Sequence, residues 1–307
     1  MALGVTEDIT ELIGKTPLLR FKHIVPAGAA NVYGKLEYLN PGGSIKDRAA
    51  MGLITDAERQ GFLKPGGTII EPTAGNTGVG LALIGRARGY RIVLCVPEGY
   101  SIEKMKVTQA LGGEIVYTPN ELGMQGAIDK AFELSKTIPD SFVPQQFSNP
   151  ANPRYHYETT GREIYEQLDG KVDAVVIGCG SAGTFSGVAR YVRERNPLAV
   201  CIAVETQGSV LGGGQLGPHR VEGIGTSFIP GNFDQEVCNK IVAVMDDDAF
   251  ATVRALAAQE GVLCGGSSGA NVFAAIQLAK QLGPGKNIVT ILPDSAERYM
   301  SKGIFDE

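Results

Sequence analysis

Residues 172–184 read VDAVVIGCGSAGT, and much of the chain repeats their plan. The first six residues have the apolar, β-branched character of a short buried strand. The glycine-rich segment 178–183 then predicts a tight turn, because glycine adopts backbone conformations that other residues avoid. A helical pattern begins near Thr184. We therefore expect a strand, a loop and a helix in succession.

The same alternation extends along the chain in both directions. Because strands that alternate with helices form parallel sheets covered on both faces, we predict an α/β protein with doubly wound, parallel-rich sheets. Pro144 and Pro153 bracket a region that interrupts the pattern and indicates a domain boundary. The expected strands lie at residues 68–70, 92–96, 114–117, 172–177, 200–204 and 287–292, and the expected helices near 47–60, 77–89, 101–112, 123–137, 184–195, 247–260 and 269–282.

The composition of the 307 residues, 43% hydrophobic and 20% charged, is that of a soluble globular protein. A net charge of −5 with scattered Lys and Arg argues against nucleic-acid binding. No apolar run is long enough to span a bilayer and no cationic apolar leader opens the chain, so we expect no membrane association. Five separated cysteines and three histidines fit no metal-binding spacing. We expect a cytoplasmic protein with reduced thiols, no metal, and histidines at the surface or behind the site.

The loop at residues 178–183 satisfies the pattern G-x-G-x-x-G, and the acid Glu205 ends the next strand about 20 residues later. This combination is the short signature of a dinucleotide-binding fold, so one hypothesis is that the protein is an NAD-dependent oxidoreductase. The backbone amides of such a loop would hold any phosphate equally well. The loop therefore predicts a phosphate more firmly than it predicts a dinucleotide.

A second stretch, residues 41–48, reads PGGSIKDR. Ser44 is expected to cap a helix whose first turn contains Asp47 and Lys46. The positive end of the helix dipole and the neighbouring Arg48 should lower the pKa of Lys46, which suits an amine that forms a Schiff base with a carbonyl cofactor. The alternative from this segment alone is a solvated lysine, since lysines are usually exposed.

Two further loops each precede a helix. Residues 71–78, EPTAGNTG, offer helix-start amides and threonine hydroxyls that suit a carboxylate, although an ordinary turn with a threonine cap is equally consistent. In residues 263–270, LCGGSSGA, Ser267 or Ser268 is expected to be the N-cap of the helix. The glycines around residues 222–225 are uninformative by themselves.

Several ordered segments, together with these loops, carry a family resemblance. They read ITELIGKTPL at 9–18, QQFSNPANP at 145–153 and ERY at 297–299. The chain resembles the cysteine synthase and cystathionine β-synthase family of pyridoxal-phosphate (PLP) enzymes, the fold type II group related to the tryptophan synthase β subunit. The resemblance implies a smaller mobile domain at 41–145 that carries the substrate carboxylate loop. A larger domain, 1–40 with 146–307, would carry the phosphate loop.

The resemblance also implies residue roles. Lys46 would carry PLP as a Schiff base and later take the Cα proton of the substrate, Asn76 would meet the 3′-oxygen, and Ser267 would bond the pyridine nitrogen and leave it neutral. The loop that would hold the cofactor phosphate consists of Gly178, Cys179, Gly180, Ser181, Ala182, Gly183 and Thr184. The amino-acid substrate would be bound by Thr73, Ala74, Gly75, Asn76 and Thr77, with Gln146 nearby and Gly223 lining the site.

The implied reaction is β-replacement on O-acetyl-L-serine through an α-aminoacrylate. Ala74 and Gly266 stand where many cysteine synthases have serine and isoleucine, so we expect homocysteine as the thiol, cystathionine as the product and sulfide as a further acceptor. Cysteine synthase is the alternative activity. Ser181 and Ala182 depart from a commoner Thr-Gly, with little expected consequence. Haem is not expected; a homodimer and a serine acetyltransferase tail are the implied partners.

Overall fold

The computed structural model describes residues 4–100 and 102–306, which divide into two compact units. One contains the described residues up to Gly14 together with Asn40–Ala151, and the other contains Lys15–Leu39 and Asn152 onward. Both are α/β units in which helices flank a parallel-rich sheet, so the predicted fold class is confirmed. We call them the first and the second unit.

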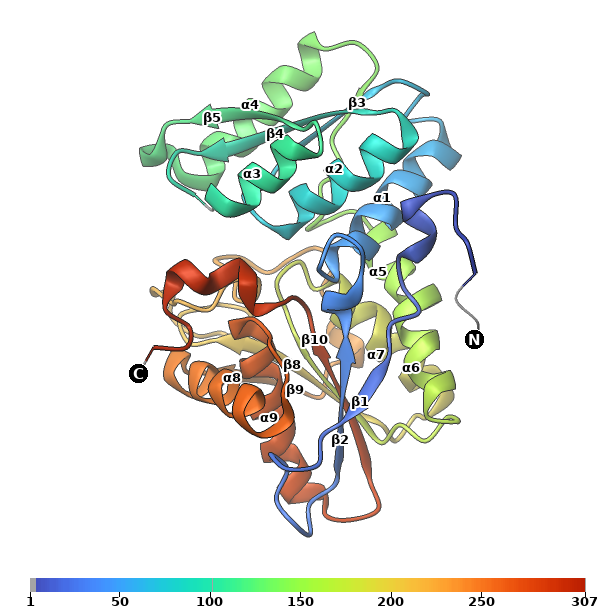
Figure 1. Ribbon diagram of the computed structural model, residues 1–307, viewed down its shortest axis with the longest axis vertical. Coiled ribbons are helices and arrows are strands. Elements are labelled where there is room, and N and C mark those ends of the chain that lie inside the picture. The colour runs from blue at the N-terminus through green and yellow to red at the C-terminus, as the bar shows by residue number, and fades with distance from the viewer. Residues whose placement is uncertain (1–3, 101, 307) are drawn as a thin grey trace. The chain divides into compact units, whose positions relative to one another are not determined.

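The second unit is built on a sheet whose strands lie in the order β1-β2-β10-β7-β8-β9 (Figure 1). β1 runs antiparallel to β2, and the other neighbours pair in parallel. The central strands β10, β7 and β8 are apolar runs with buried side chains, as expected for a sheet covered on both faces. The strands are β1 (Leu18–Arg20), β2 (Asn31–Leu36), β7 (Ala174–Gly178), β8 (Val200–Thr206), β9 (Lys240–Val244) and β10 (Asn287–Leu292).

Helices cover both faces of this sheet. α8 and α9 pack together on one face, and α7 lies against the other (Figure 1). A column of short helices runs beside α7, in which a π-helical segment, η4, joins α5 to α6. The helices are α5 (Ala151–His156), η4 (Tyr157–Gly161), α6 (Arg162–Gln167), α7 (Gly183–Arg195), α8 (Asp246–Glu260) and α9 (Gly266–Leu282).

The first unit has a four-stranded sheet in the order β5-β4-β3-β6, with every neighbouring pair parallel. α4 packs on one face, and α2 and α3 lie on the other with α1 against α2 (Figure 1). The elements are β3 (Thr68–Pro72), β4 (Arg91–Pro97), β5 (Glu114–Thr118), β6 (Ser141–Phe142), α1 (Lys46–Gln60), α2 (Asn76–Arg88), α3 (Ile102–Ala110) and α4 (Gly123–Thr137).

The structure forms every strand and helix that the sequence predicts, and it adds the strands β1, β2, β6 and β9 and the helical segments α5, η4 and α6. Short 3₁₀ helices complete the described chain at Ile9–Leu12, Glu37–Leu39, Asn120–Leu122, Gln235–Val237 and Ala296–Lys302.

The domain limits predicted from the resemblance differ from the units by a few residues. The described residues up to Gly14, Asn40 and residues 146–151 lie with the first unit. Whether residues 41–145 move as a domain stays a prediction.

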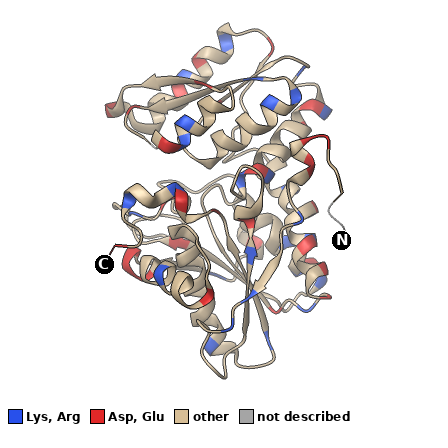
Figure 2. Cartoon of the chain, viewed as in Figure 1, with Lys and Arg blue, Asp and Glu red and all other residues tan. Residues whose placement is uncertain are grey.

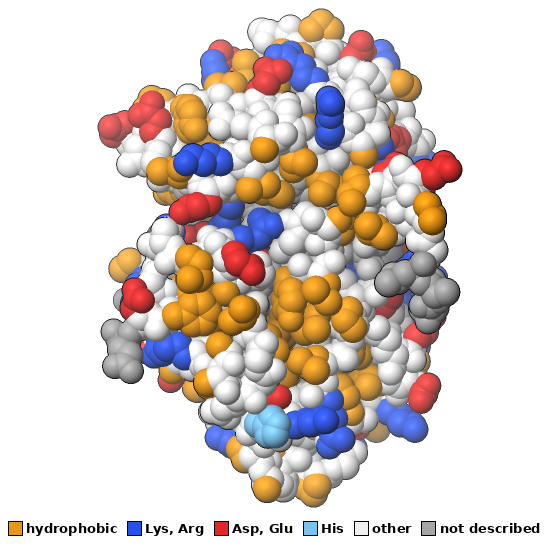
Figure 3. All heavy atoms as spheres, viewed as in Figure 1, with side chains coloured by type: hydrophobic (Ala, Val, Ile, Leu, Met, Phe, Trp, Pro, Cys, Tyr) orange, Lys and Arg blue, Asp and Glu red, His pale blue; other side chains and the backbone are white. Residues whose placement is uncertain are grey.

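Charged side chains are distributed over both units. Figure 2 shows basic and acidic residues interspersed along the helices. On the face shown in Figure 3, apolar side chains reach the surface in separate patches with charged side chains between them. Among the described residues, no helix combines the length and the apolar character needed to cross a bilayer.

Candidate functional site

Lys46 is the first residue of α1 and is half-buried. The hydroxyl of Ser44 accepts the backbone N–H of Lys46 at 3.3 Å. Ser44 is not the N-cap of α1, contrary to prediction, because the cap is Ile45. The carboxylate of Asp47 accepts the N–H of Gly42 at 2.6 Å. A side chain at position 42 would collide with this carboxylate, so the glycine is required for the turn that leads into Lys46.

A second glycine brings Lys46 close to α2. A Cβ at Gly80 would lie 3.0 Å from the carbonyl oxygen of Lys46 and 3.2 Å from the Cβ of Ala50. Because Gly80 has no side chain, α1 and α2 pack at backbone distance. The first turn of α2, which begins at Asn76, therefore lies in the same part of the first unit as Lys46.

The predicted carboxylate loop joins β3 to α2. Thr73 and Thr77 are buried, whereas the residues between them are half-buried. The hydroxyl of Thr73 accepts the N–H of Gly75 at 3.2 Å, and that of Thr77 donates to Oε1 of Gln146 at 2.7 Å. The first N–H groups of a helix have no intrahelical acceptor and can bind an anion. The loop, Gln146 and Lys46 are thus brought together within one unit.

Glu71 supports this loop, a role that its sequence context does not indicate. It is 1% exposed, and its carboxyl group accepts the backbone N–H of Gln145 at 3.1 Å and that of Gln146 at 3.3 Å. Burial raises the pKa of Glu71 to about 7, and the two N–H donors lower it in part. Gln145 has φ of 56°, a left-handed conformation that few residues adopt without such support. Glu71 therefore fixes the turn that presents Gln146.

The predicted phosphate loop joins β7 to α7 in the second unit. Ala182 precedes α7 with φ of 62°, and the helix begins at Gly183, so amides at this end are available to an anion. Ser181 accepts a hydrogen bond from the side-chain amide of Asn152 at 3.0 Å. Cys179 is a different case within this loop. Its backbone N–H donates to the carbonyl oxygen of Val204 at 2.8 Å and is therefore already bonded within the chain.

Gly223 and Ser267 adjoin this loop. A Cβ at Gly180 would collide with the carbonyl oxygen of Gly223, and one at Gly223 would lie 3.9 Å from Oγ of Ser267. These close approaches bring the predicted phosphate loop, Gly223 and Ser267 together in the second unit.

Neither Ser267 nor Ser268 is the N-cap of α9, contrary to prediction. The cap is Gly265, and both serines lie in the first turn. Ser267 is 3% exposed, and its hydroxyl lies on the side of α9 that faces Gly223. A hydroxyl at this position can donate a hydrogen bond to a ring nitrogen, which fits the pyridine nitrogen of PLP.

Gly266 does not open space near Ser267. A Cβ there would point at the ring of Phe250, at 3.1 Å, and at Val221, at 3.6 Å. Both neighbours belong to the hydrophobic core. The small size of Gly266 is therefore explained by the packing of Phe250 and Val221, and the prediction of the acceptor thiol rests on Ala74.

Glu205 does not serve as the ribose-binding acid of a dinucleotide site. It is 3% exposed, and its carboxylate accepts the backbone N–H groups of Leu211 at 3.0 Å and Gly212 at 3.1 Å. Because this carboxylate already stabilises a loop of its own chain, the dinucleotide reading loses the residue on which it depended.

Comparisons with known proteins agree with the PLP reading. Residues 9–294 match the family model described as "Pyridoxal-phosphate dependent enzyme". The chain is 51% identical over 305 residues to an O-acetylserine dependent cystathionine beta-synthase of Bacillus subtilis, and 48% identical over 307 residues to a cysteine synthase of Staphylococcus aureus. Each alignment covers 99% of both chains.

A solved structure shows the same arrangement of elements. It is an O-acetylserine dependent cystathionine beta-synthase from Helicobacter pylori, with a TM-score of 0.94 and 43% sequence identity. The match covers 99% of this chain and 100% of the other.

Proposed function

Because the chain belongs to the family of pyridoxal-phosphate dependent enzymes, we propose that it performs β-replacement on O-acetyl-L-serine. The thiol that replaces acetate is L-homocysteine, which gives cystathionine, and sulfide is also accepted. The observation that supports the proposal is the close packing of α1, which begins at Lys46, against α2, which follows the loop 73–77, in a unit that also holds Gln146. An amine next to a carboxylate-binding loop is the arrangement that an amino-acid substrate requires.

The roles of the first unit follow from these contacts. The amides at the start of α2, including that of Thr77, bind the carboxylate of the donor together with the hydroxyl of Thr73. The hydroxyl of Thr77 gives its proton to Gln146 instead. Binding of the carboxylate fixes the donor Cα near Lys46. The Nζ atom of Lys46 anchors the cofactor in the resting enzyme and then accepts the Cα proton as a general base.

The roles of the second unit concern the cofactor. Bound PLP supplies an electron sink for the carbanion that forms at Cα. The amides between Gly180 and Thr184 hold its phosphate. The hydroxyl of Ser267 hydrogen-bonds the pyridine nitrogen without protonating it, which favours elimination of acetate over transamination.

The choice of thiol rests on Ala74. Homocysteine brings a second amino-acid head group, which needs more room than sulfide does. A serine at position 74 would add a hydroxyl to the half-buried carboxylate loop. An obstruction of this size changes discrimination by about 1–3 kcal/mol. Cysteine synthase is the second candidate function, because a 48% identical relative bears that name.

A competition assay tests the choice of thiol. The purified enzyme receives O-acetylserine with equal concentrations of homocysteine and sulfide, and cystathionine and cysteine are quantified. Cystathionine should dominate for the wild type, and Ala74→Ser should shift the ratio toward cysteine about tenfold. Ala110→Ser, at the exposed end of α3, is the matched control. A wild type that makes only cysteine, or an unchanged ratio in Ala74→Ser, would identify the protein as a cysteine synthase.

The proposal includes an assembly and a location. A homodimer, and docking of a serine acetyltransferase tail, follow from the resemblance. We place the reaction in the cytoplasm, where reducing conditions keep thiols such as the five free cysteines of this chain unpaired.

A further inference from the structure

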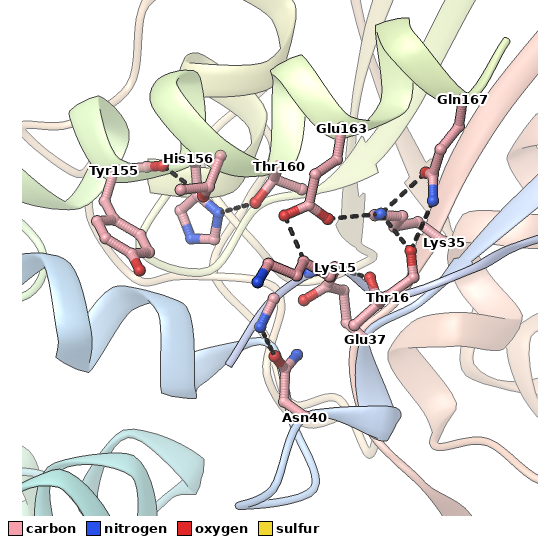
Figure 4. A network of polar contacts seen from close by, with 12 residues as sticks. Lys15, Thr16, Lys35, Glu37, Asn40, Tyr155, His156, Thr160, Glu163 and Gln167 are labelled. Atoms are coloured by element: carbon pink, nitrogen blue, oxygen red, sulfur yellow. Dashed lines mark hydrogen bonds and ion pairs between the residues drawn. The ribbon is translucent and has the colours of Figure 1, made fainter. Parts of the chain in front are cut away.

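The ring of His156 bridges two threonine hydroxyls in the second unit. Its Nδ1 atom lies 2.9 Å from Oγ1 of Thr160 (Figure 4), and its Nε2 atom lies 3.2 Å from Oγ1 of Thr184. His156 is 1% exposed and ends α5, whereas Thr184 lies in the first turn of α7, at the proposed phosphate site. The His156 ring therefore connects the start of α7, where the predicted phosphate loop ends, to α5, a separate helix.

Close packing fixes the position of this ring relative to α7. A Cβ at Gly187 would collide with the carbonyl oxygen of Pro153 and lie 2.8 Å from the Cβ of His156. A Cβ at Gly161 would lie 2.8 Å from the Cβ of Tyr191. Gly187 on α7 and Gly161 in η4 thus let the backbones of α7 and of the α5–η4 column pack closely together.

The far end of the same column is held by a buried cation. Nζ of Lys35, on β2, lies 2.8 Å from Oε2 of Glu163 and 2.9 Å from Oε1 of Gln167, both on α6 (Figure 4). Lys35 is fully buried and also donates to the carbonyl oxygen of Thr16. The column that carries His156 is therefore fixed to the central sheet as well as to α7.

The direction of these hydrogen bonds follows from the ligand. A phosphate accepts hydrogen bonds, so the Thr184 hydroxyl must give it its only proton. Thr184 can then only accept from His156, which requires a proton on Nε2. A neutral ring protonated at Nε2 has a lone pair at Nδ1, and Thr160 donates to it. In the opposite tautomer, Nε2 has a lone pair and the Thr184 hydroxyl would donate its proton to it. That proton would then not be available for a hydrogen bond to the phosphate.

We propose that His156 is a positioning residue, held as the Nε2–H tautomer by Thr160, that turns the hydroxyl proton of Thr184 toward the cofactor phosphate. This inference rests on the proposed function, because it takes the phosphate of PLP as the acceptor. It deepens that function by making the hydroxyl of Thr184 a donor of fixed direction.

Tautomer and affinity are separate readouts. The chain has three histidines, so ring-nitrogen spectra of the 15N-histidine-labelled holoenzyme are assigned with single variants at each of them. We expect a protonated Nε2 and an unprotonated Nδ1 for His156. For affinity, PLP is titrated into the apoenzyme. His156→Leu should weaken binding about tenfold, the scale of one hydrogen bond to a charged group, and should shift the 31P resonance of the bound phosphate.

Two further variants separate positioning from packing. His156→Gln keeps an N–H donor for Thr184 and should restore most of the affinity, whereas a purely structural histidine would be replaced equally badly by Leu and by Gln. In a Thr184→Val background, His156→Leu should have little additional effect on PLP affinity.

The outcomes distinguish the inference from the function it rests on. A His156 ring protonated at Nδ1, or wild-type PLP affinity in His156→Leu, overturns the inference while the proposed function stands. A wild-type protein that takes up no PLP at all overturns both.

Discussion

The hydroxyl of Thr77 donates to the side-chain oxygen of Gln146 at 2.7 Å, although 69 residues separate the two in sequence. The bond joins the first turn of α2 to the turn that Glu71 stabilises. Because the backbone N–H of Thr77 is a proposed donor to the substrate carboxylate, the position of this helix start depends on Gln146.

Gln146→Ala should therefore weaken donor binding. Loss of this hydrogen bond is worth about 1 kcal/mol, so the KM for O-acetylserine should rise about fivefold with a smaller change in kcat. Steady-state kinetics with O-acetylserine as the varied substrate measure the effect. Gln145→Asn, at the exposed neighbouring position, is the control and should leave KM unchanged. Equal KM values for the wild type and both variants would show that Gln146 does not contribute to binding of O-acetylserine.

Glu71 should make stability depend on pH. Its pKa is raised from an ordinary value of 4.5 to about 7 by burial. Below pH 4.5 the carboxyl group is protonated in the folded and the unfolded protein, and no stability is lost. As pH rises from 4.5 to 7, only the unfolded chain ionises, which lowers the free energy of unfolding by about 3 kcal/mol.

The comparison variant is Glu71→Gln, which cannot ionise. Urea unfolding at pH 5 and pH 8 should show a smaller loss of stability in the variant than in the wild type. If the free energy of unfolding falls by the same amount in both proteins between these pH values, burial does not raise the pKa of Glu71.

Ala182→Gly should stabilise the protein. Alanine at φ of 62° costs roughly 1–2 kcal/mol, of which the larger unfolded-state entropy of glycine cancels part. The expected gain is about 0.5–1 kcal/mol in the free energy of unfolding, measured by urea denaturation with saturating PLP. Ala189→Gly, in the interior of α7, should instead destabilise by about 1 kcal/mol. A loss of stability in Ala182→Gly would show that this residue is not strained.

Ser267→Asp tests the contact to the pyridine nitrogen. A carboxylate there should hold a proton on the ring, shift the absorption of bound PLP and lower β-replacement on the order of a hundredfold. Ser267→Ala should retain the wild-type spectrum and lose less activity, because the elimination needs no ring proton. Two variants that both match the wild type in spectrum and rate would leave Ser267 as a structural residue of α9.

The sequence predicted the alternation of strands and helices well. Runs such as Ala174–Gly178 are apolar because both faces of a parallel sheet are covered, and the glycine loops mark where such strands end. The position of Lys46 at a helix start follows from the local segment alone. These features depend on neighbouring residues, which a sequence displays directly.

Features that depend on distant residues were not predicted. Nothing near position 266 indicates that a side chain there would meet Phe250, and nothing near Ser267 shows that Gly265 is the cap. The left-handed backbone of Ala182, which precedes α7, was not predicted either. His156 and Thr184 are 28 residues apart, and only the packing of α5 against α7 joins them.

The attachment of PLP to Lys46 is the central claim, and borohydride reduction followed by peptide mapping tests it most directly. The purified protein should be yellow, should lose this colour on reduction, and should yield a single pyridoxyl-labelled peptide with the label on Lys46. Lys46→Ala should take up no covalent label under the same treatment. A label on another residue, or a colourless wild-type protein that remains unlabelled after incubation with PLP, would contradict the account.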